Sequence, residues 1–280
     1  MMWNNQSTNN EMFYQEERFL TCMIRMIQEA NKVVLDIYNT DFETYTKEDE
    51  SPLTQADEKC NKLICKFLED MNNLLKLYYF GISYDGIIII SEENKNMDYK
   101  DRKDKEWTWL VDPVDGTKEF VKKNGQFTIN VGLAKWGVPV FGIVSIPVTN
   151  EIYYGTKGRG SFKLLNGVKT ELIREVKEYD IEQENIRIIC SSSHMSEKTE
   201  LYVKQFKNPE LINIGSSIKL LYIAENKADV YPRLAPTSEW DTCAAHAVVK
   251  FAGGIVLNFD TGEELTYNKE NLLNPDFIVH

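Results

Sequence analysis

The stretch Leu110-Val111-Asp112-Pro113-Val114-Asp115-Gly116-Thr117 decides how the rest of the chain is interpreted. An apolar run that starts at residue 107 predicts a buried strand ending at Asp112. Pro113 has no N–H and cannot continue a central ladder. A second carboxylate follows at Asp115, and Gly116-Thr117 can open a helix. Two carboxylates therefore stand at a strand end, beside backbone that a ligand can approach.

This combination suits a hard divalent cation, Mg²⁺ or Mn²⁺, held by oxygen ligands and shared with a phosphate at a helix N-terminus. It is also typical of an ordinary turn, because Asp-Pro and Asp-Gly are both frequent turn dipeptides. The stretch alone does not separate the two interpretations, and other acidic positions along the chain have to decide between them.

The composition is that of an acidic globular protein. The chain has 280 residues, 42% of them hydrophobic and 27% charged, with a formal net charge of -11. This length suffices for one large domain or two medium ones. The charge disfavours nonspecific binding to nucleic acid or to an acidic membrane surface. An anionic substrate would therefore need metal ions or a local basic patch.

Cysteine usage and the N-terminal segment predict a cytoplasmic protein. The five cysteines are odd in number and show no C-x-x-C spacing, which indicates reduced thiols. Residues 1–10 are polar, and we expect them to be disordered and to carry no secretory signal. No apolar run approaches membrane-spanning length, so no membrane partner is expected. The sequence does not reveal the oligomeric state, and we favour a monomer.

Asp57 has two possible roles at the start of a predicted helix. Apolar residues at helical spacing from Ala56 to Met71 predict that helix, and Thr54 with Asp57 fits a capping box, in which each side chain satisfies an unpaired N–H. Alternatively, Asp57 lies at an exposed helix start that faces the metal site, where it could orient a water or contact a third ion. The sequence leaves both roles open.

Two other acidic positions also stand at predicted element ends. Glu92 follows the buried strand Ile87–Ile90, and pairing of adjacent strands would bring its carboxylate close to Asp112. Asp241 precedes a helix expected over Cys243–Phe251, where it is either the N-cap or a metal ligand. Because these acidic residues are far apart in sequence but share this position, they favour a metal site over a turn.

The remaining pattern predicts two domains. We expect a long amphipathic helix over Met12–Tyr38 and an antiparallel meander of strands between residues 125 and 165. The charged segment 94–106 is expected to be a mobile surface loop near the site. Residues 167–185 lack a clear apolar face, and we place a boundary near residue 178, between an N-terminal α+β domain (1–178) and a C-terminal α/β domain (179–280).

The second half offers candidates for anion binding. His194 follows a Ser-rich strand end, although a lone histidine is more often structural. Ser216 and Ser217 follow a glycine and open a helix that has Lys219 in its first turn. The helix dipole disfavours a cation there by about 0.3–1 kcal/mol, a cost that an anionic ligand would offset. Arg233 ends a predicted strand and can bind a phosphate through two parallel hydrogen bonds.

These motifs together resemble the inositol monophosphatase superfamily of Mg²⁺-dependent, lithium-sensitive phosphatases. The resemblance spans residues 51–277, and its motifs are Asp-Pro-Val-Asp-Gly-Thr, Glu92-Glu93, Trp240-Asp241 and Ala252-Gly253-Gly254. Within the superfamily the chain most resembles the 3′(2′),5′-bisphosphate nucleotidases, on the motifs Lys118-Glu119-Phe120, Gly215-Ser216-Ser217-x-Lys219 and Tyr231-Pro232-Arg233. Ala245 replaces a usual glycine, and we expect a packing adjustment there.

The resemblance implies a fold and a metal site. The fold would be a layered α+β or α/β sandwich, α-β-α-β-α, with the site between the two domains. Two Mg²⁺ ions, which Mn²⁺ can replace, would be held by Glu92, Asp112, Asp115, Asp241 and the Val114 carbonyl. A third, weaker ion would contact Glu92 and Asp57.

The resemblance also implies an activity. Gly116 and Thr117 would bind the scissile phosphate, while Asp57 and Thr117 orient and deprotonate the attacking water. The rest of the nucleotide would be bound by His194, Ser216, Ser217, Lys219 and Arg233. The substrate would be adenosine 3′,5′-bisphosphate, with its 5′-sulfated analogue as a second. The alternatives are an inositol phosphate phosphatase of the same fold and a catalytically silent nucleotide- or metal-binding protein.

Overall fold

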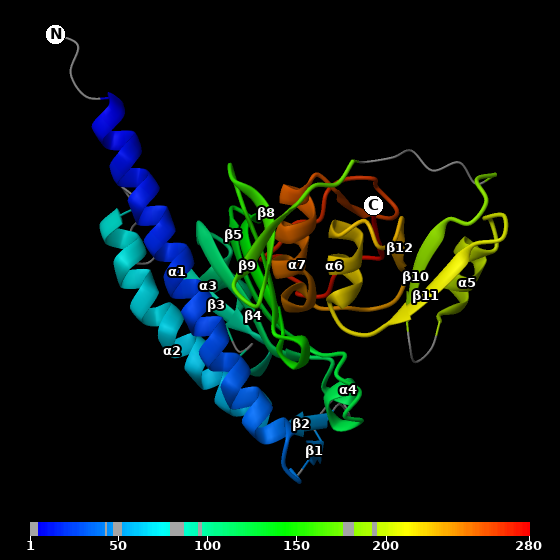
Figure 1. Ribbon diagram of the computed structural model, residues 1–280, viewed down its shortest axis with the longest axis horizontal. Helices are drawn as coiled ribbons and strands as arrows, with labels where there is room; N and C mark the ends of the chain where they lie inside the picture. The colour runs from blue at the N-terminus through cyan, green and yellow to red at the C-terminus, as the bar shows by residue number, and fades with distance from the viewer. Residues whose placement is uncertain are drawn as a thin grey trace.

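The computed structural model describes residues 5–42, 44–46, 52–78, 87–94, 97–175, 182–191 and 195–280; for residues 5–16, 44–46, 52–53 and 73–78 it describes the backbone alone. Five layers follow one another across the molecule: two helices, a large sheet, two more helices, smaller sheets and an outer helix (Figure 1). This order confirms the predicted α-β-α-β-α sandwich. The domain boundary expected near residue 178 lies outside the described residues.

The first layer consists of α1 (Asn5–Tyr38) and α2 (Gln55–Tyr78), which pack on one face of the large sheet (Figure 1). Their apolar stripes, from residue 23 on α1 and residue 56 on α2, are fully buried there. Between them, β1 (Thr44–Thr46) and β2 (Pro52–Thr54) pair antiparallel. The helix α1 begins seven residues earlier than the sequence predicts, so the expectation of disorder is wrong for residues 5–10.

The large sheet has the strand order β3-β4-β5-β6-β7-β8-β9 within the described residues. Its strands are β3 (Ile87–Ser91), β4 (Trp107–Asp115), β5 (Thr128–Lys135), β6 (Val138–Ile146), β7 (Glu151–Thr156), β8 (Gly160–Leu165) and β9 (Val168–Leu172). Only β3 and β4 run parallel, and the later pairs confirm the predicted antiparallel meander. The sequence pattern missed β9, because only its last residue is buried.

The strand β4 does not end at Asp112 as predicted. It continues to Asp115, and its register against β5 shifts between these two residues. The neighbour β3 pairs only as far as Val111, so Pro113 lies beyond the part of β4 that is paired on both sides. A proline is tolerated where one partner strand is missing or a bulge interrupts the ladder. The irregularity redirects the chain between the two aspartates.

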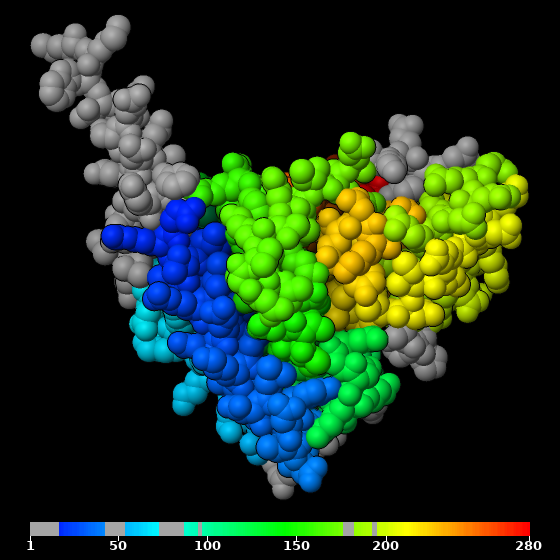
Figure 2. Space-filling model, in the orientation of Figure 1, coloured from blue at the N-terminus to red at the C-terminus, as the bar shows by residue number. Residues whose placement is uncertain are grey.

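The second half of the chain supplies the last three layers. The helices are α5 (Glu197–Val203), α6 (Ile218–Ala224) and α7 (Glu239–Ala252); the strands are β10 (Arg187–Ser191), β11 (Glu210–Ile214), β12 (Tyr231–Arg233), β13 (Val256–Asn258) and β14 (Phe277–Val279). β10 and β11 pair in parallel, and β14 lies between β12 and β13. In the space-filling view the green strands of the large sheet lie between blue α1 and this yellow half (Figure 2).

A row of glycines allows α7 to lie directly on the large sheet. Gly132, Gly142 and Gly155 are paired across β5, β6 and β7. A Cβ at Gly132 would stand 2.7 Å from the Ala244 nitrogen, one at Gly142 would overlap the Ala244 carbonyl, and one at Gly155 would stand 2.5 Å from a carbonyl in the next turn of α7. The backbone of α7 therefore touches the sheet, which fixes the depth at which its first turn lies. Ala245 is fully buried on α7.

The charged segment between β3 and β4 contains a short helix, α3 (Tyr99–Arg102), where the sequence predicts only a loop. Arg102 is buried and donates to the Asn268 side chain and to the carbonyls of Lys269 and Glu270. The segment 97–106 is therefore attached to residues 268–270 through the buried Arg102 guanidinium, in addition to its connections to the neighbouring strands. In the described residues, none of the helices is long and apolar enough to span a membrane. The five cysteines form no disulfide there.

Candidate active site

Four elements bring acidic side chains to one edge of the large sheet. Because β3 and β4 are parallel, Glu92 follows the end of β3 on the same side as Asp112 on β4. Asp115 ends β4, Asp57 lies in the first turn of α2, and Asp241 lies in the first turn of α7. The structure thus gathers all five predicted acidic residues.

The helix that carries Asp241 begins earlier than predicted. It starts at Glu239 with Ser238 as its N-cap, so Asp241 is the third helical residue rather than the cap. Its Oδ2 accepts the Ser238 N–H at 2.9 Å and so completes a capping box. Asp112 is held similarly, with its Oδ1 accepting the Val114 N–H at 3.0 Å. One oxygen of each carboxylate is thereby oriented by the backbone.

Asp57 both caps the start of α2 and faces the acidic cluster, so the two roles considered for it are compatible. It forms the expected capping box: its Oδ2 accepts from the Thr54 N–H at 2.9 Å and from the Thr54 hydroxyl at 2.6 Å. Its Oδ1 lies 3.4 Å from the Thr117 hydroxyl, which is 3.2 Å from the Val114 carbonyl. The Asp57 side chain is fully buried rather than exposed as predicted, and α4 (Thr117–Val121) packs against β2, the strand that precedes α2.

The clustered carboxylates repel one another, and burial adds to the effect. Burial raises the pKa of Asp112 well above its ordinary value, and the charges of Glu92, Asp115, Asp241 and Asp57 raise it further. Burial, followed by the charges of Asp115 and Glu92, raises the pKa of Asp241 to about 8. Such a cluster is a strong attractor for cations.

The donor set fits magnesium. Five carboxylates and the Val114 carbonyl offer oxygen atoms only, which is the ligand type that Mg²⁺ and Mn²⁺ prefer. Among the residues described, however, no three acidic, histidine or cysteine side chains already stand in a ready-made metal-binding arrangement. Asp115 illustrates why, since its Oδ2 accepts from the Ser216 hydroxyl and the Ser217 N–H, both at 2.5 Å.

These contacts to Asp115 join the two halves of the chain. The Ser217 hydroxyl donates to Asn130 at 2.8 Å, and Thr128 lies 2.6 Å from the Ser216 hydroxyl oxygen. Thr128 and Asn130 are fully buried on β5. Sequence analysis missed both; the available signal was two polar residues at alternate positions of an otherwise apolar strand.

Gly116 is the N-cap of α4 and requires its glycine. Its φ is +91°, and a Cβ there would stand 3.1 Å from the Gln126 carbonyl and 3.3 Å from the Ser216 Cβ. A side chain at residue 116 would therefore be strained and would close the gap between the two halves. The predicted phosphate-binding pair Gly116 and Thr117 lies at this point.

A pocket next to the acidic cluster is lined by cationic residues. Lys219 is buried at the start of α6, with its Nζ 5.8 Å from the centre of the Tyr231 ring. Arg233 on β12 donates to the Pro236 carbonyl, and its buried Nε has no hydrogen-bond partner among the described residues. The lining also includes Asp115, Gly116, Ser216, Ser217 and Asp241.

Some pocket residues were not predicted, and one predicted residue falls outside the part of the chain that the structure describes. The lining includes Lys118, Glu119, Thr237 and Thr242, which the sequence interpretation gave no site role. Lys118 and Glu119 had been quoted only as part of a motif, while Thr237 and Thr242 carry no local signal. His194, predicted to bind the nucleotide, lies outside the described residues.

Comparisons with known proteins agree on one family. The profile of the inositol monophosphatase family matches residues 15–276. The 3′(2′),5′-bisphosphate nucleotidase CysQ of Salmonella typhimurium is 34% identical over 91% of this chain and 96% of its own length. CysQ of Bacteroides thetaiotaomicron superposes with a TM-score of 0.76 at 38% identity, covering 93% of this chain and 96% of that one. The chain therefore belongs to the inositol monophosphatase family, as its motifs indicated.

Proposed function

We propose that this protein is a Mg²⁺-dependent phosphatase that removes the 3′-phosphate of adenosine 3′,5′-bisphosphate, giving AMP and phosphate. The observation that carries the proposal is the pairing of an acidic cluster with a cationic pocket across Asp115 and Gly116. A substrate with two phosphates can place one in each. The CysQ relatives are named 3′(2′),5′-bisphosphate nucleotidases, which supports this substrate class, and the 5′-sulfated analogue has the same pair of anionic groups.

Enzymes of this family depend on metal ions, typically Mg²⁺. Here Glu92, Asp112, Asp115 and Asp241, with the Val114 carbonyl, would hold two ions, and Asp57 with Glu92 would contact a third. Bound there, Mg²⁺ or Mn²⁺ would neutralise the carboxylates and stabilise charge on the phosphoryl oxygens and the leaving group. To bind a metal ion, Asp115 would give up the hydrogen bonds that it accepts from Ser216 and Ser217.

Asp57 and Thr117 would orient and deprotonate the attacking water. The Thr54 contacts hold Oδ2 of Asp57, so Oδ1 is directed toward the Thr117 hydroxyl. A proton can pass from water through this hydroxyl to the carboxylate as the water oxygen attacks phosphorus in line. The P–O bond to the ribose then breaks. The ribose oxygen takes up a proton from solvent, and the Asp57 carboxyl returns one proton to solvent. The N–H groups of Gly116 and Thr117 would bind the transferred phosphoryl group.

The second phosphate would lie in the cationic pocket. Lys219 and Arg233 supply positive charge, and Ser216 and Ser217 supply hydroxyls close to it. His194 is included as a further nucleotide-binding residue on the sequence prediction alone. The partner is thus a small nucleotide bisphosphate, and a monomeric, cytoplasmic protein remains our expectation.

The test compares phosphate release from adenosine 3′,5′-bisphosphate, adenosine 3′-monophosphate and inositol 1-phosphate, with Mg²⁺ or with chelator. We expect the bisphosphate to have the highest kcat/KM and all activity to need Mg²⁺. Lys219→Met should raise KM for the bisphosphate far more than for the 3′-monophosphate. Lys198→Met, at an exposed ion pair with Asp276, is the matched control.

Two outcomes would contradict the proposal. Faster hydrolysis of inositol 1-phosphate by the intact enzyme would assign the chain to the inositol phosphate phosphatases instead. Absence of phosphate release from all three esters with Mg²⁺ present would favour a binding protein without catalytic activity.

A further inference from the structure

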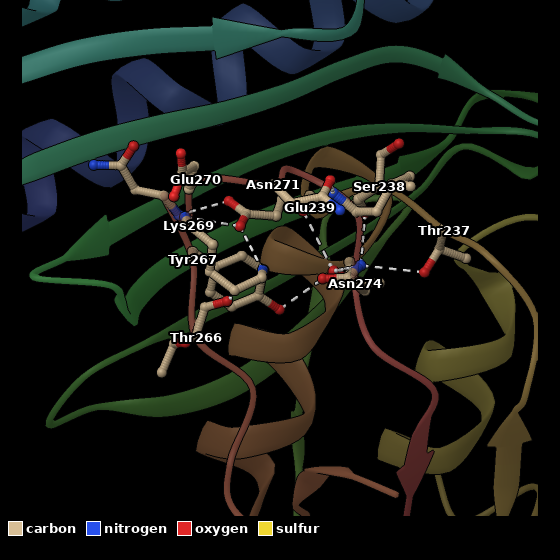
Figure 3. A network of polar contacts seen from close by, with 12 residues as sticks. Thr237, Ser238, Glu239, Thr266, Tyr267, Lys269, Glu270, Asn271 and Asn274 are labelled. Carbon is tan, nitrogen blue, oxygen red and sulfur yellow. Dashed lines mark hydrogen bonds and ion pairs between the residues drawn. The ribbon is translucent and has the colours of Figure 1, made fainter. Parts of the chain in front are cut away.

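A fully buried carboxylate lies two residues before Asp241, at the very start of α7. Glu239 accepts the Asn268 N–H at 2.5 Å. It also accepts the Lys269 N–H at 3.0 Å and the Lys269 ammonium at 2.5 Å (Figure 3). Asn268 has a φ of +62°, which turns two successive N–H groups toward the same anion. A loop that follows α7 by many residues is thereby bound to its first turn.

The same loop is held from its other side by α3. Arg102 donates to the Asn268 side chain at 2.8 Å and to the carbonyls of Lys269 and Glu270 at 2.7 and 2.9 Å. Asn268 returns a bond to the Arg102 carbonyl at 2.9 Å. The loop thus directs N–H groups toward the Glu239 carboxylate and carbonyl groups toward the Arg102 guanidinium. Each charge therefore lies beside backbone groups of opposite partial charge.

Further bonds from this loop surround Asp241. Asn274 donates to the Ser238 carbonyl at 2.8 Å (Figure 3). It also donates to the Thr242 hydroxyl at 3.0 Å. Ser238 in turn donates its N–H to Asp241. Residues on both sides of Asp241 are therefore fixed by contacts that originate in residues 268–274.

We propose that Glu239 and Arg102 are positioning residues that set the affinity of the acidic cluster for Mg²⁺. The segment that contains Arg102 joins β3, which precedes Glu92, to β4, which carries Asp112. Glu239 lies on the helix that carries Asp241. The loop 268–274 contacts both residues, and it therefore connects the segment between Glu92 and Asp112 to the helix that carries Asp241. This inference rests on the metal role proposed for Asp241.

The test measures Mg²⁺ binding by titration calorimetry, and by the rise in Tm that Mg²⁺ produces, in the full-length protein. The variants are Glu239→Gln and Arg102→Met, with Lys198→Met as a matched control. Changes to groups that orient metal ligands commonly weaken metal binding 10–100-fold. We expect each of the two variants to weaken Mg²⁺ binding by about 10-fold, and the control to leave it unchanged.

A merely structural role would give a different pattern. The positioning role predicts that a higher Mg²⁺ concentration restores kcat in Glu239→Gln, with KM for the bisphosphate unchanged. The double variant should be weakened by less than the product of the single effects, because both residues act through one loop. Should Glu239→Gln not fold, Arg102→Lys, which keeps the charge but loses the forked geometry, carries the same test.

The outcomes separate this inference from the proposed function. If the native protein binds no Mg²⁺, the proposed function fails. If the native protein binds Mg²⁺, Asp241→Asn loses it, and the Glu239 and Arg102 variants bind it as tightly as the native protein, the positioning role is overturned. A lower Tm of these variants without any change in Mg²⁺ affinity would also overturn it.

Discussion

At the scale of single residues, the site is a set of acidic groups held in a place that disfavours their charge. Asp112 is 2% exposed and Asp241 is partly buried, and the pKa of each is raised by burial and by neighbouring carboxylates. Folding therefore stores electrostatic repulsion at this edge of the sheet. A bound cation removes that repulsion, which couples the stability of the fold to metal and to pH.

This coupling predicts a pH dependence for the metal-free protein. The pKa of Asp241 is about 8 in the folded protein and about 3.9 in an unfolded chain, so between these values the folded state binds more protons. The free energy of unfolding should fall as pH rises from about 4 to 8. Because Asp241 is partly exposed, we expect a contribution of only about 1–3 kcal/mol.

Asp241→Asn tests this coupling by thermal unfolding in chelator. The variant should be more stable than the native protein at pH 8, should show a shallower pH dependence, and should gain little from Mg²⁺. Asp276→Asn, at the partly exposed ion pair with Lys198, is the control. Equal slopes for the native protein and Asp241→Asn would show that the Asp241 carboxyl does not carry the effect.

The second residue-scale prediction concerns Thr117. Its hydroxyl lies between Asp57 and the Val114 carbonyl, so Thr117→Ala should lower kcat by about 10²-fold or more, as expected for loss of a general-base pathway. Thr117→Ser keeps the hydroxyl and should retain most activity. Steady-state kinetics at saturating Mg²⁺ measures both, and an active Thr117→Ala enzyme would exclude the assigned role.

At the scale of elements, the position of α7 depends on residues that have no side chain. Gly132, Gly142 and Gly155 lie side by side on three strands and admit the helix backbone. Moving α7 away from the large sheet would break the packing between them. The first turn of α7 therefore holds Asp241 at a fixed distance from the sheet. The precision of the site thus depends partly on packing far from the chemistry.

Gly142→Ala should destabilise the protein by about 3 kcal/mol, because the added methyl group overlaps the Ala244 carbonyl. Gly167→Ala is the control: nothing lies within 4 Å of a Cβ there, and only its φ of +80° opposes the change, at a cost of about 1 kcal/mol. Denaturant unfolding measures both. An equal loss of unfolding free energy in the two variants would mean that the three glycines do not determine how closely α7 packs on the sheet.

Elements with strong local patterns could be predicted from the sequence, and weakly patterned ones could not. The long helices and the meander follow from apolar periodicity. The strand β9 was missed because it is an exposed edge strand, whose pairing with β8 compensates for its lack of an apolar face. The passage of β4 through Pro113 was also missed, since it depends on β3 having already ended.

At the scale of the whole molecule, the site exists because two halves of an acidic chain meet. The carboxylates of the first half and Asp241 of the second lie beside a pocket with Lys219 and Arg233. The motif residues could be named from sequence because each stands at or within a few residues of an element end. The hydrogen bonds that Asp115 accepts from Ser216 and Ser217, and the one between Ser216 and Thr128, could not, because these cross between the halves and depend on the packing of α6 and α7.

The central claim is that acidic residues from separate elements of this fold bind divalent metal together. The most direct test is a crystal structure grown with Mn²⁺ and adenosine 3′,5′-bisphosphate, with Mn²⁺ located by anomalous scattering. We predict Mn²⁺ bound by Glu92, Asp112, Asp115 and Asp241, with Asp115 turned away from Ser217. An ordered site with no anomalous peak among these carboxylates would contradict the account.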